Sequence, residues 1–114
     1  MNILIVDDEP LLTNLVQRVL EQDGWGVTVA HSLLDAKAQP GPFDAIVADV
    51  RLPNGDGRHL KELHPGIPFI TMSGLHGELP DLPKPFSPAQ LKATVYAAVP
   101  DLDRRGLPRE GEFS

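Results

Sequence analysis

Short apolar runs rich in β-branched residues recur along the chain, and most of them end abruptly at polar side chains. Strands that are buried on both faces of a parallel sheet have this unbroken apolar pattern. The runs that predict strands are Asn2–Val6, Val27–Ala30, Ala45–Ala48, Pro68–Met72 and, very briefly, Leu82–Pro83.

Segments with helical periodicity or helix-capping residues lie between these runs. The predicted helices are one that begins at Pro10 and stops at Gly24, one from Ser32 to Ala38, one over Arg58–Leu63 and one that begins at Ser87 and ends near Val99. Ser87 carries the strongest signal, because Gln90 completes a capping box with it. Strands and helices alternate, so we expect an α/β fold with a doubly wound parallel sheet.

A chain of 114 residues suits one domain, and a hydrophobic content of 41% is enough for one core. We expect residues 1–99 to form that domain. Residues 100–114 are charged, contain proline and glycine and lack an apolar pattern, so we expect a disordered C-terminal tail.

Charge and composition exclude several classes of function. The 10 basic and 16 acidic side chains give a net charge of −6, so we expect no nucleic-acid binding by this domain. The absence of cysteine excludes disulfides, thiolate zinc sites and cysteine nucleophiles. No apolar run approaches the roughly 20 residues of a membrane span, and no basic segment precedes the first run as in a secretory signal. We therefore expect a cytoplasmic protein without a membrane partner.

Polar side chains follow the predicted strands at their carboxyl ends, where doubly wound sheets collect functional groups. These residues are Asp7, Asp8, Glu9, Asp49, Ser73 and Lys84. Carboxylates at close quarters repel unless a cation or protons compensate them, and oxygen ligands without cysteine favour Mg²⁺. A divalent cation beside an aspartate, a hydroxyl and a lysine suits phosphoryl transfer, in which a carboxylate attacks in line.

Four motifs occur in the order Ile3-Leu4-Ile5-Val6-Asp7-Asp8-Glu9-Pro10, Asp49-Val50-Arg51-Leu52-Pro53-Asn54-Gly55-Asp56-Gly57, Ser73-Gly74 and Lys84-Pro85-Phe86. Together they resemble the receiver domain of two-component response regulators, from residue 1 to about residue 99. The resemblance implies a flavodoxin-like receiver fold, a five-stranded parallel sheet with strand order 2-1-3-4-5. It also implies a signalling module, not an enzyme, that at most catalyses its own phosphorylation and dephosphorylation.

The resemblance assigns a role to each site residue. Asp49 would be the phosphoacceptor, Ser73 would hydrogen-bond one phosphoryl oxygen, and Lys84 would pair with another. The Mg²⁺ ligands would be Asp7 or, chiefly, Asp8, together with Asp49 and the backbone carbonyl of Arg51. The peptide bond before Pro85 would be cis.

The segment between Ser73 and Lys84 departs from the usual receiver pattern. Only 11 positions separate the two residues, which is too few for a helix of average length with its loops. We therefore expect the fourth helix of the family to be reduced or absent. Asp81 stands where receivers usually carry a switching aromatic residue, so we expect the output surface to lie elsewhere than on the face that this helix would form.

The remaining polar residues are expected to have ordinary structural roles. Asp56 is interpreted as a turn or cap residue and Trp25 as a packing residue. The histidines have no metal-ligand spacing and are expected to be solvated; they are His31, His59, His64 and His76.

The leading hypothesis is a phosphoacceptor receiver of a histidine-to-aspartate phosphorelay, phosphorylated on Asp49 with Mg²⁺. Its partners would be a histidine kinase or phosphotransfer protein and a downstream protein. The alternative is a receiver-like adaptor that binds its partner without phosphorylation. A metal-dependent phosphatase is disfavoured because we find neither a substrate pocket nor a base to activate water. An Asp49→Asn substitution would abolish the function of a phosphoacceptor and spare that of an adaptor.

Overall fold

A five-stranded parallel sheet forms the centre of the computed structural model, which describes residues 1–74 and 80–99. Its strands lie in the order β2-β1-β3-β6-β7, which confirms the expected order 2-1-3-4-5 and the α/β fold. They are β1 (Asn2–Val6), β2 (Gly26–Ala30), β3 (Ala45–Asp49), β6 (Phe69–Ser73) and β7 (Leu82–Pro83). An antiparallel hairpin of β4 (Arg51–Leu52) and β5 (Gly55–Asp56) follows β3 in the chain.

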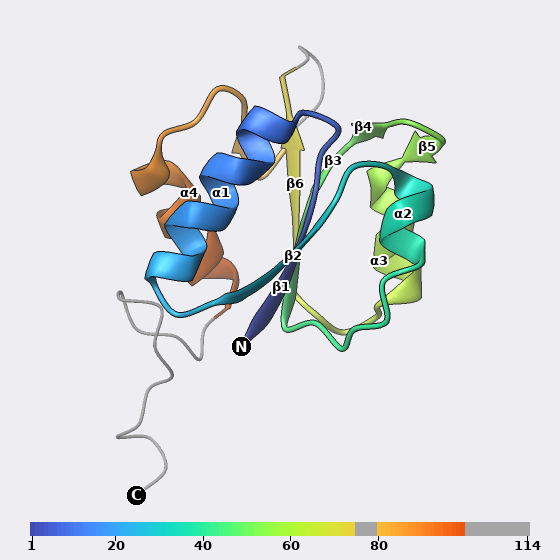
Figure 1. Cartoon of the computed structure of the whole chain (residues 1–114), viewed down its shortest axis with the longest axis horizontal. Coiled ribbons are helices and arrows are strands. Elements are labelled where there is room, and N and C mark those ends of the chain that lie inside the picture. The colour runs from blue at the N-terminus through green and yellow to red at the C-terminus, as the bar shows by residue number, and fades with distance from the viewer. Residues whose placement is uncertain (75–79, 100–114) are drawn as a thin grey trace, which may run out of the picture.

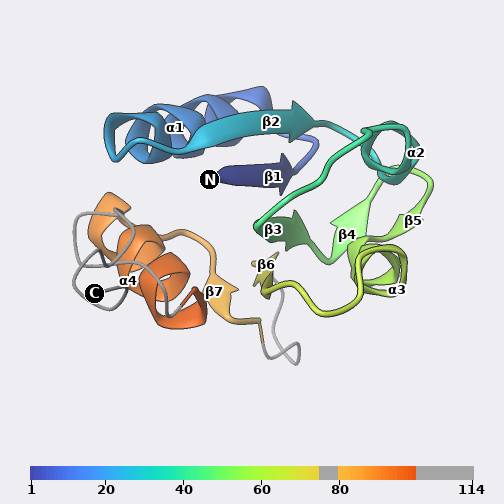
Figure 2. The same ribbon diagram turned by 90° about the horizontal axis from the view of Figure 1, so that it is seen from below.

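Helices cover both faces of the sheet (Figures 1 and 2). One face carries α1 (Pro10–Gln22) and α4 (Pro88–Ala98); the other carries α2 (Leu33–Lys37), the 3₁₀ turn η1 (Gly57–His59) and α3 (Leu60–Leu63). The helix expected over Arg58–Leu63 is therefore divided between η1 and α3. None of the helices in the described ranges is long and apolar enough to cross a membrane.

An apolar core lies on each side of the sheet, because successive side chains along a strand point to opposite faces. The larger core lies under α1 and α4 and includes Ile5, Leu20, Trp25 and Val95. The smaller core lies under α2 and α3 and includes Leu60. Leu91, Val95 and Val99, which the sequence places on one helical face, are all buried in the larger core.

The apolar stripe of α1 is wider than the surface that the core buries. Val16 and Leu20 are fully buried, but Leu11 is 79% exposed and Leu15 is 40% exposed. A helix that packs on one layer buries only one stripe of its surface. The two leucines lie outside that stripe and form an exposed apolar surface at the N-terminal half of α1.

The connection from β6 to β7 has no helix among the residues that the structure describes. Of this segment Gly74, Pro80 and Asp81 are described, and none of them is helical. The part of the expectation that falls on residues 75–79 lies outside the described residues, as does the tail expected over residues 100–114. β7 has only two residues, and both pair with β6. The described part of this connection is consistent with a reduced or absent fourth helix.

Candidate functional site

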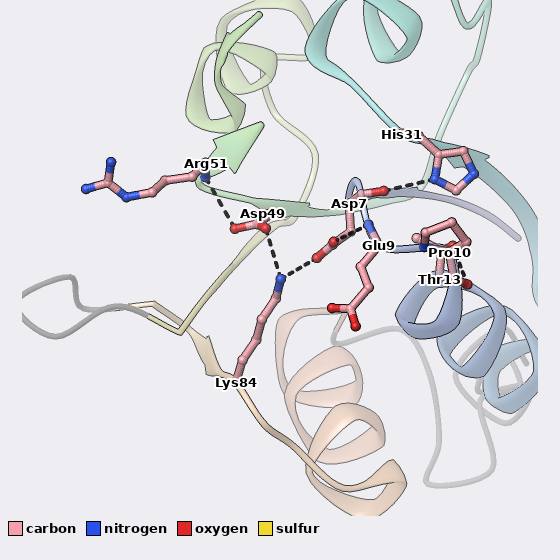
Figure 3. Close-up of polar contacts among 8 residues, drawn as sticks. All are labelled: Asp7, Glu9, Pro10, Thr13, His31, Asp49, Arg51 and Lys84. Carbon is pink, nitrogen blue, oxygen red and sulfur yellow. Dashed lines mark hydrogen bonds and ion pairs between the residues drawn. The ribbon is translucent and has the colours of Figure 1, made fainter. Parts of the chain in front are cut away.

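Charged side chains at the carboxyl ends of three strands meet in one cluster (Figure 3). Asp7 directly follows β1, Asp49 is the last residue of β3, and Lys84 directly follows β7. The carboxyl ends of parallel strands share one edge of a sheet, so residues distant in the sequence become neighbours there. The structure thus brings together three of the residues that the sequence singled out.

Lys84 bridges the two buried carboxylates. Its Nζ donates to Asp7 Oδ2 at 2.5 Å and to Asp49 Oδ2 at 2.9 Å. The side chain of Asp7 is fully buried, that of Asp49 is 12% exposed and that of Lys84 is 20% exposed. The ammonium group therefore compensates negative charge in a partly dehydrated site, where charge pairs interact strongly.

Backbone amides bind the remaining oxygens of the two carboxylates. Asp7 Oδ1 accepts from the N–H of Glu9 at 2.9 Å, and Asp49 Oδ1 accepts from the N–H of Arg51 at 3.3 Å. Both carboxylates are consequently held at two points each, one by Lys84 and one by the loop that follows their strand.

Burial and charge shift the pKa values of this cluster. Burial raises the pKa of Asp7 above 3.8, because it disfavours the carboxylate more than Lys84 and the Glu9 amide favour it. Burial alone would lower the pKa of Lys84, but hydrogen bonds and attraction from Asp7 and Asp49 outweigh it and raise that pKa above 10.5. The site therefore favours a positive charge among its carboxylates.

The acidic residues fit a hard divalent cation. Asp7, Asp8 and Asp49 each offer a carboxylate oxygen, and these atoms all lie within 4.8 Å of one another. Asp8 is exposed while the other two are buried, so a cation held here would keep contact with solvent. Oxygen ligands with retained waters are what Mg²⁺ prefers.

Ser73 and Arg51 lie beside this cluster. Ser73 is the last residue of β6, is 3% exposed, and its carbonyl accepts from the Lys84 N–H at 2.9 Å. Arg51 begins β4, and its side chain extends away from Asp49 (Figure 3). The roles that the resemblance assigns to the Ser73 hydroxyl and the Arg51 carbonyl stay predictions.

Gly57, to which the sequence analysis assigned no role, supports the site. Gly57 packs so closely on the end of β3 that a Cβ there would lie 2.0 Å from the carbonyl oxygen of Asp49. Its N–H donates to the carbonyl of Val50 at 2.9 Å. Gly57 belongs to the quoted motif, but no local pattern indicates that it touches Asp49.

His31 is exposed, as expected, and His64 is partly buried; the rings of both also make contacts that the sequence did not predict. The ring of His31 makes a hydrogen bond through Nδ1 to the backbone carbonyl of Asp7, at 3.0 Å. The ring of His64 packs edge-on against Phe43, with centroids 5.7 Å apart. His76 lies outside the described residues.

Other expectations on individual residues are confirmed. The peptide bond between Lys84 and Pro85 is cis. Asp56 is the N-cap of η1 and accepts from the N–H of Arg58 at 2.8 Å. Trp25 is buried at 4% exposure within the larger core.

Asp81 is bound to β6 beside the site. Its carboxylate accepts from the N–H of Thr71 at 2.9 Å and from the hydroxyl of Thr71 at 3.2 Å. The Asp81 N–H donates back to that hydroxyl at 3.0 Å. An aspartate at this position thus joins the short β6–β7 connection to β6 through hydrogen bonds that a phenylalanine side chain could not make.

Comparisons with known proteins show which family the chain belongs to. The family model for the response regulator receiver domain matches residues 3–84. The chain is 39% identical over 113 residues to the transcriptional regulatory protein TrcR of Mycobacterium tuberculosis, covering 83% of this chain and 44% of TrcR. It is 36% identical over 112 residues to the sensor kinase CckA of Brucella abortus, covering 82% of this chain and 12% of CckA. The chain therefore spans less than half the length of these two curated relatives.

The fold also resembles solved structures. A CheY-like response regulator receiver domain protein from Methanospirillum hungatei superimposes with a TM-score of 0.78 at 25% identity, covering 87% of this chain and 93% of that one. The beryllofluoride-activated NtrC4 receiver domain superimposes with a TM-score of 0.74 at 31% identity, covering 87% of this chain and 96% of that one.

Proposed function

Because the chain belongs to the family of response regulator receiver domains, we propose that it accepts a phosphoryl group on Asp49 in a histidine-to-aspartate phosphorelay. Receivers of this family are signalling modules, so the activity is transfer onto the protein itself. The observation that carries the proposal is the cluster in which Lys84 bridges Asp7 and Asp49 while Asp8 stands beside them in solvent.

Solvent access favours Asp49 over Asp7 as the phosphoacceptor. Asp7 is fully buried and has no access for a partner, whereas the side chain of Asp49 is 12% exposed. One Asp49 oxygen attacks the phosphorus of a phosphohistidine, the phosphorus–nitrogen bond breaks, and its electron pair stays on the imidazole nitrogen, which takes a proton from water. Lys84 then turns from the Asp49 carboxylate to an oxygen of the transferred group, with Ser73 beside it on the neighbouring strand.

The metal ligands would be Asp7, Asp8 and Asp49, with the Arg51 carbonyl as the further ligand that the family resemblance implies. Mg²⁺ bound there would neutralise phosphoryl oxygens during the transfer. Asp8 is the only exposed carboxylate of the three, so the ion could exchange with solvent at this residue while the protein stays folded.

The phosphodonor would be a histidine kinase or a phosphotransfer protein, and we propose that it contacts the exposed start of α1. A cavity of about 400 Å³ lies there, lined by Leu11, Leu15 and Phe86 and by Lys84 of the site. Because Lys84 lines this cavity and binds Asp49, apolar contacts at Leu11 and Leu15 would place a donor histidine near Asp49. A downstream protein, not nucleic acid, would receive the signal from this domain in the cytoplasm.

A second candidate function is a receiver-like adaptor that works without phosphorylation. Asp81 favours the adaptor function. It stands where receivers usually carry an aromatic residue that moves on activation, and its hydrogen bonds to Thr71 hold it in place. Such an adaptor would keep its partner affinity when Asp49 is replaced.

Treatment with a small-molecule phosphodonor tests the phosphoacceptor proposal without the unknown kinase. We expect the intact mass of the protein to rise by one phosphoryl group when acetyl phosphate and Mg²⁺ are both present. Glu62, an exposed carboxylate on α3, provides the control: Glu62→Gln should be phosphorylated like wild type, whereas Asp49→Asn should not. A folded wild type that stays unmodified, or an Asp49→Asn variant that is still modified, would contradict the proposal.

A further inference from the structure

The peptide that joins Asp7 to Asp8 is held by a histidine from the neighbouring strand. His31 directly follows β2, and its Nδ1 lies 3.0 Å from the carbonyl oxygen of Asp7 (Figure 3). The other polar atoms of Asp7 have different partners: its N–H donates to the carbonyl of Ala30 at 3.1 Å, and its carboxylate binds Lys84 and the Glu9 N–H. Of these contacts, only the one with His31 acts on the peptide that leads to Asp8.

The sheet itself does not supply this hydrogen bond. The paired register of β1 and β2 ends at Val6 and Ala30, and the next ladder donor to the Asp7 carbonyl would be the N–H of Ser32. Ser32 is instead the N-cap of α2, where its hydroxyl accepts from Asp35. The N–H of His31 is directed to the Asp35 carboxylate at 3.3 Å. The chain has therefore left the sheet, and the imidazole takes the place of the missing ladder donor.

This contact has a consequence for the direction of Asp8. The carbonyl of Asp7 and the N–H of Asp8 belong to one planar peptide unit. A partner that fixes the carbonyl therefore restricts rotation of that unit, and with it the position from which the Asp8 side chain departs. Asp8 is exposed and, unlike Asp7 and Asp49, is not held by Lys84, so its backbone is the main restraint on its carboxylate.

We propose that His31 is a positioning residue for the metal site, because its imidazole holds the Asp7–Asp8 peptide so that the Asp8 carboxylate stays beside those of Asp7 and Asp49. The inference rests on the proposed Mg²⁺ site and adds a residue to it. Residues that hydrogen-bond to metal ligands and orient them commonly affect metal affinity, which falls when such a residue is replaced.

The hydrogen bond also determines the tautomer of the ring. A carbonyl oxygen can only accept, so Nδ1 of His31 must carry the hydrogen, and Nε2 is left to solvent when the ring is neutral. A solvated neutral histidine favours the opposite tautomer. Long-range ¹H–¹⁵N NMR of the metal-free wild type therefore tests the contact directly, without any substitution. We expect Nδ1 of His31 to be protonated at a pH where the ring is neutral.

Substitutions then test the effect on the metal. Mg²⁺ is titrated into each variant while the amide shifts of Asp8 and Asp49 are followed, and thermal unfolding is recorded separately in EDTA. His31→Leu should raise the Kd for Mg²⁺ by about 3- to 10-fold, the weak end of such effects because the contact acts through the backbone. His31→Asn, whose amide can donate from a similar position, should restore the Kd to within about 2-fold of wild type. His59→Leu, at an exposed histidine on η1, is the matched control and should leave the Kd unchanged.

The outcomes separate this inference from the proposed function. A wild type without saturable Mg²⁺ shifts at Asp8 and Asp49 would overturn the metal site and the inference together. A wild type that binds Mg²⁺, with an unchanged Kd in His31→Leu or no recovery in His31→Asn, would overturn the inference alone. A neutral His31 protonated on Nε2 would do the same. A purely structural role would lower the unfolding temperature of His31→Leu and leave its Kd at the wild-type value.

Discussion

Replacing Lys84 by methionine should destabilise the metal-free protein, because it leaves two carboxylates without their shared cation. Methionine keeps most of the length and the apolar stem of lysine, so the change removes chiefly the charge. The ammonium contacts Asp7 at 2.5 Å and Asp49 at 2.9 Å. Coulomb's law with an effective dielectric constant of about 20 gives roughly 6 kcal/mol for the longer contact alone, before the cost of dehydrating the charges is subtracted.

The net loss is smaller than this Coulomb energy. Removing one partner of a buried ion pair costs about 3–5 kcal/mol. Lys84 is 20% exposed, and the raised pKa of Asp7 lets that residue take up a proton, so we expect a loss of about 2–3 kcal/mol. For a domain of this size that corresponds to a fall in Tm of roughly 10–20 °C.

Urea denaturation in EDTA measures the loss, with Lys92→Met as the matched control. Lys92 pairs with Asp23 at 3.3 Å, and its side chain is 36% exposed, so its replacement should cost at most about 1 kcal/mol. Mg²⁺ should restore part of the stability of Lys84→Met, because it supplies positive charge to the same carboxylates. A loss below about 0.5 kcal/mol, or one equal to that of Lys92→Met, would refute the reasoning.

Three further predictions concern stability and local opening. Asp7→Asn should raise the free energy of unfolding at pH 7 by on the order of 1 kcal/mol, because the asparagine resembles the protonated acid that burial favours. The folded pKa of Asp7 lies above 3.8, so wild-type Asp7 is protonated in both the folded and the unfolded state below about pH 3.8, and the gain should vanish there. Urea denaturation measures the gain, and a gain that persists below that pH would contradict the raised pKa of Asp7. Ser87→Ala should cost about 1 kcal/mol in the same assay through loss of the α4 capping box, and an unchanged midpoint would count against that box. Asp81→Ala should speed hydrogen exchange of the Thr71 amide about tenfold, whereas equal exchange rates would show that the contact with Asp81 does not protect it.

The sheet and the acidic cluster could be predicted from the sequence because their signals are local. Most strands are short, mainly apolar runs that are followed by, or end at, a charged or hydroxyl residue, and the parallel topology brings those ends to one edge. The clustering of Asp7, Asp49 and Lys84 could therefore be predicted without knowing any contact between them. The hairpin of β4 and β5 was not predicted, because two-residue strands are too short to show a periodic pattern.

Contacts between side chains and distant backbone could not be predicted in this way. The hydrogen bond from His31 to Asp7 joins residues 24 positions apart, and the contact of Asp23 with Tyr96 joins residues 73 apart. The exposure of Leu11 depends on which stripe of α1 faces the sheet, and apolar residues surround more of that helix than the core can bury. Only the packed structure separates the buried leucines from the exposed ones.

Beryllofluoride binding tests the central claim most directly, because this anion mimics a phosphoryl group on an aspartate without a kinase. Amide NMR spectra would be compared for wild type, Asp49→Asn and the control Glu62→Gln, each with and without Mg²⁺. We predict shifts at Asp49, Ser73 and Lys84 that require both Mg²⁺ and Asp49 and that persist in Glu62→Gln. A folded wild type that does not respond to beryllofluoride and Mg²⁺, or an equal response in Asp49→Asn, would contradict the claim that Asp49 is the phosphoacceptor.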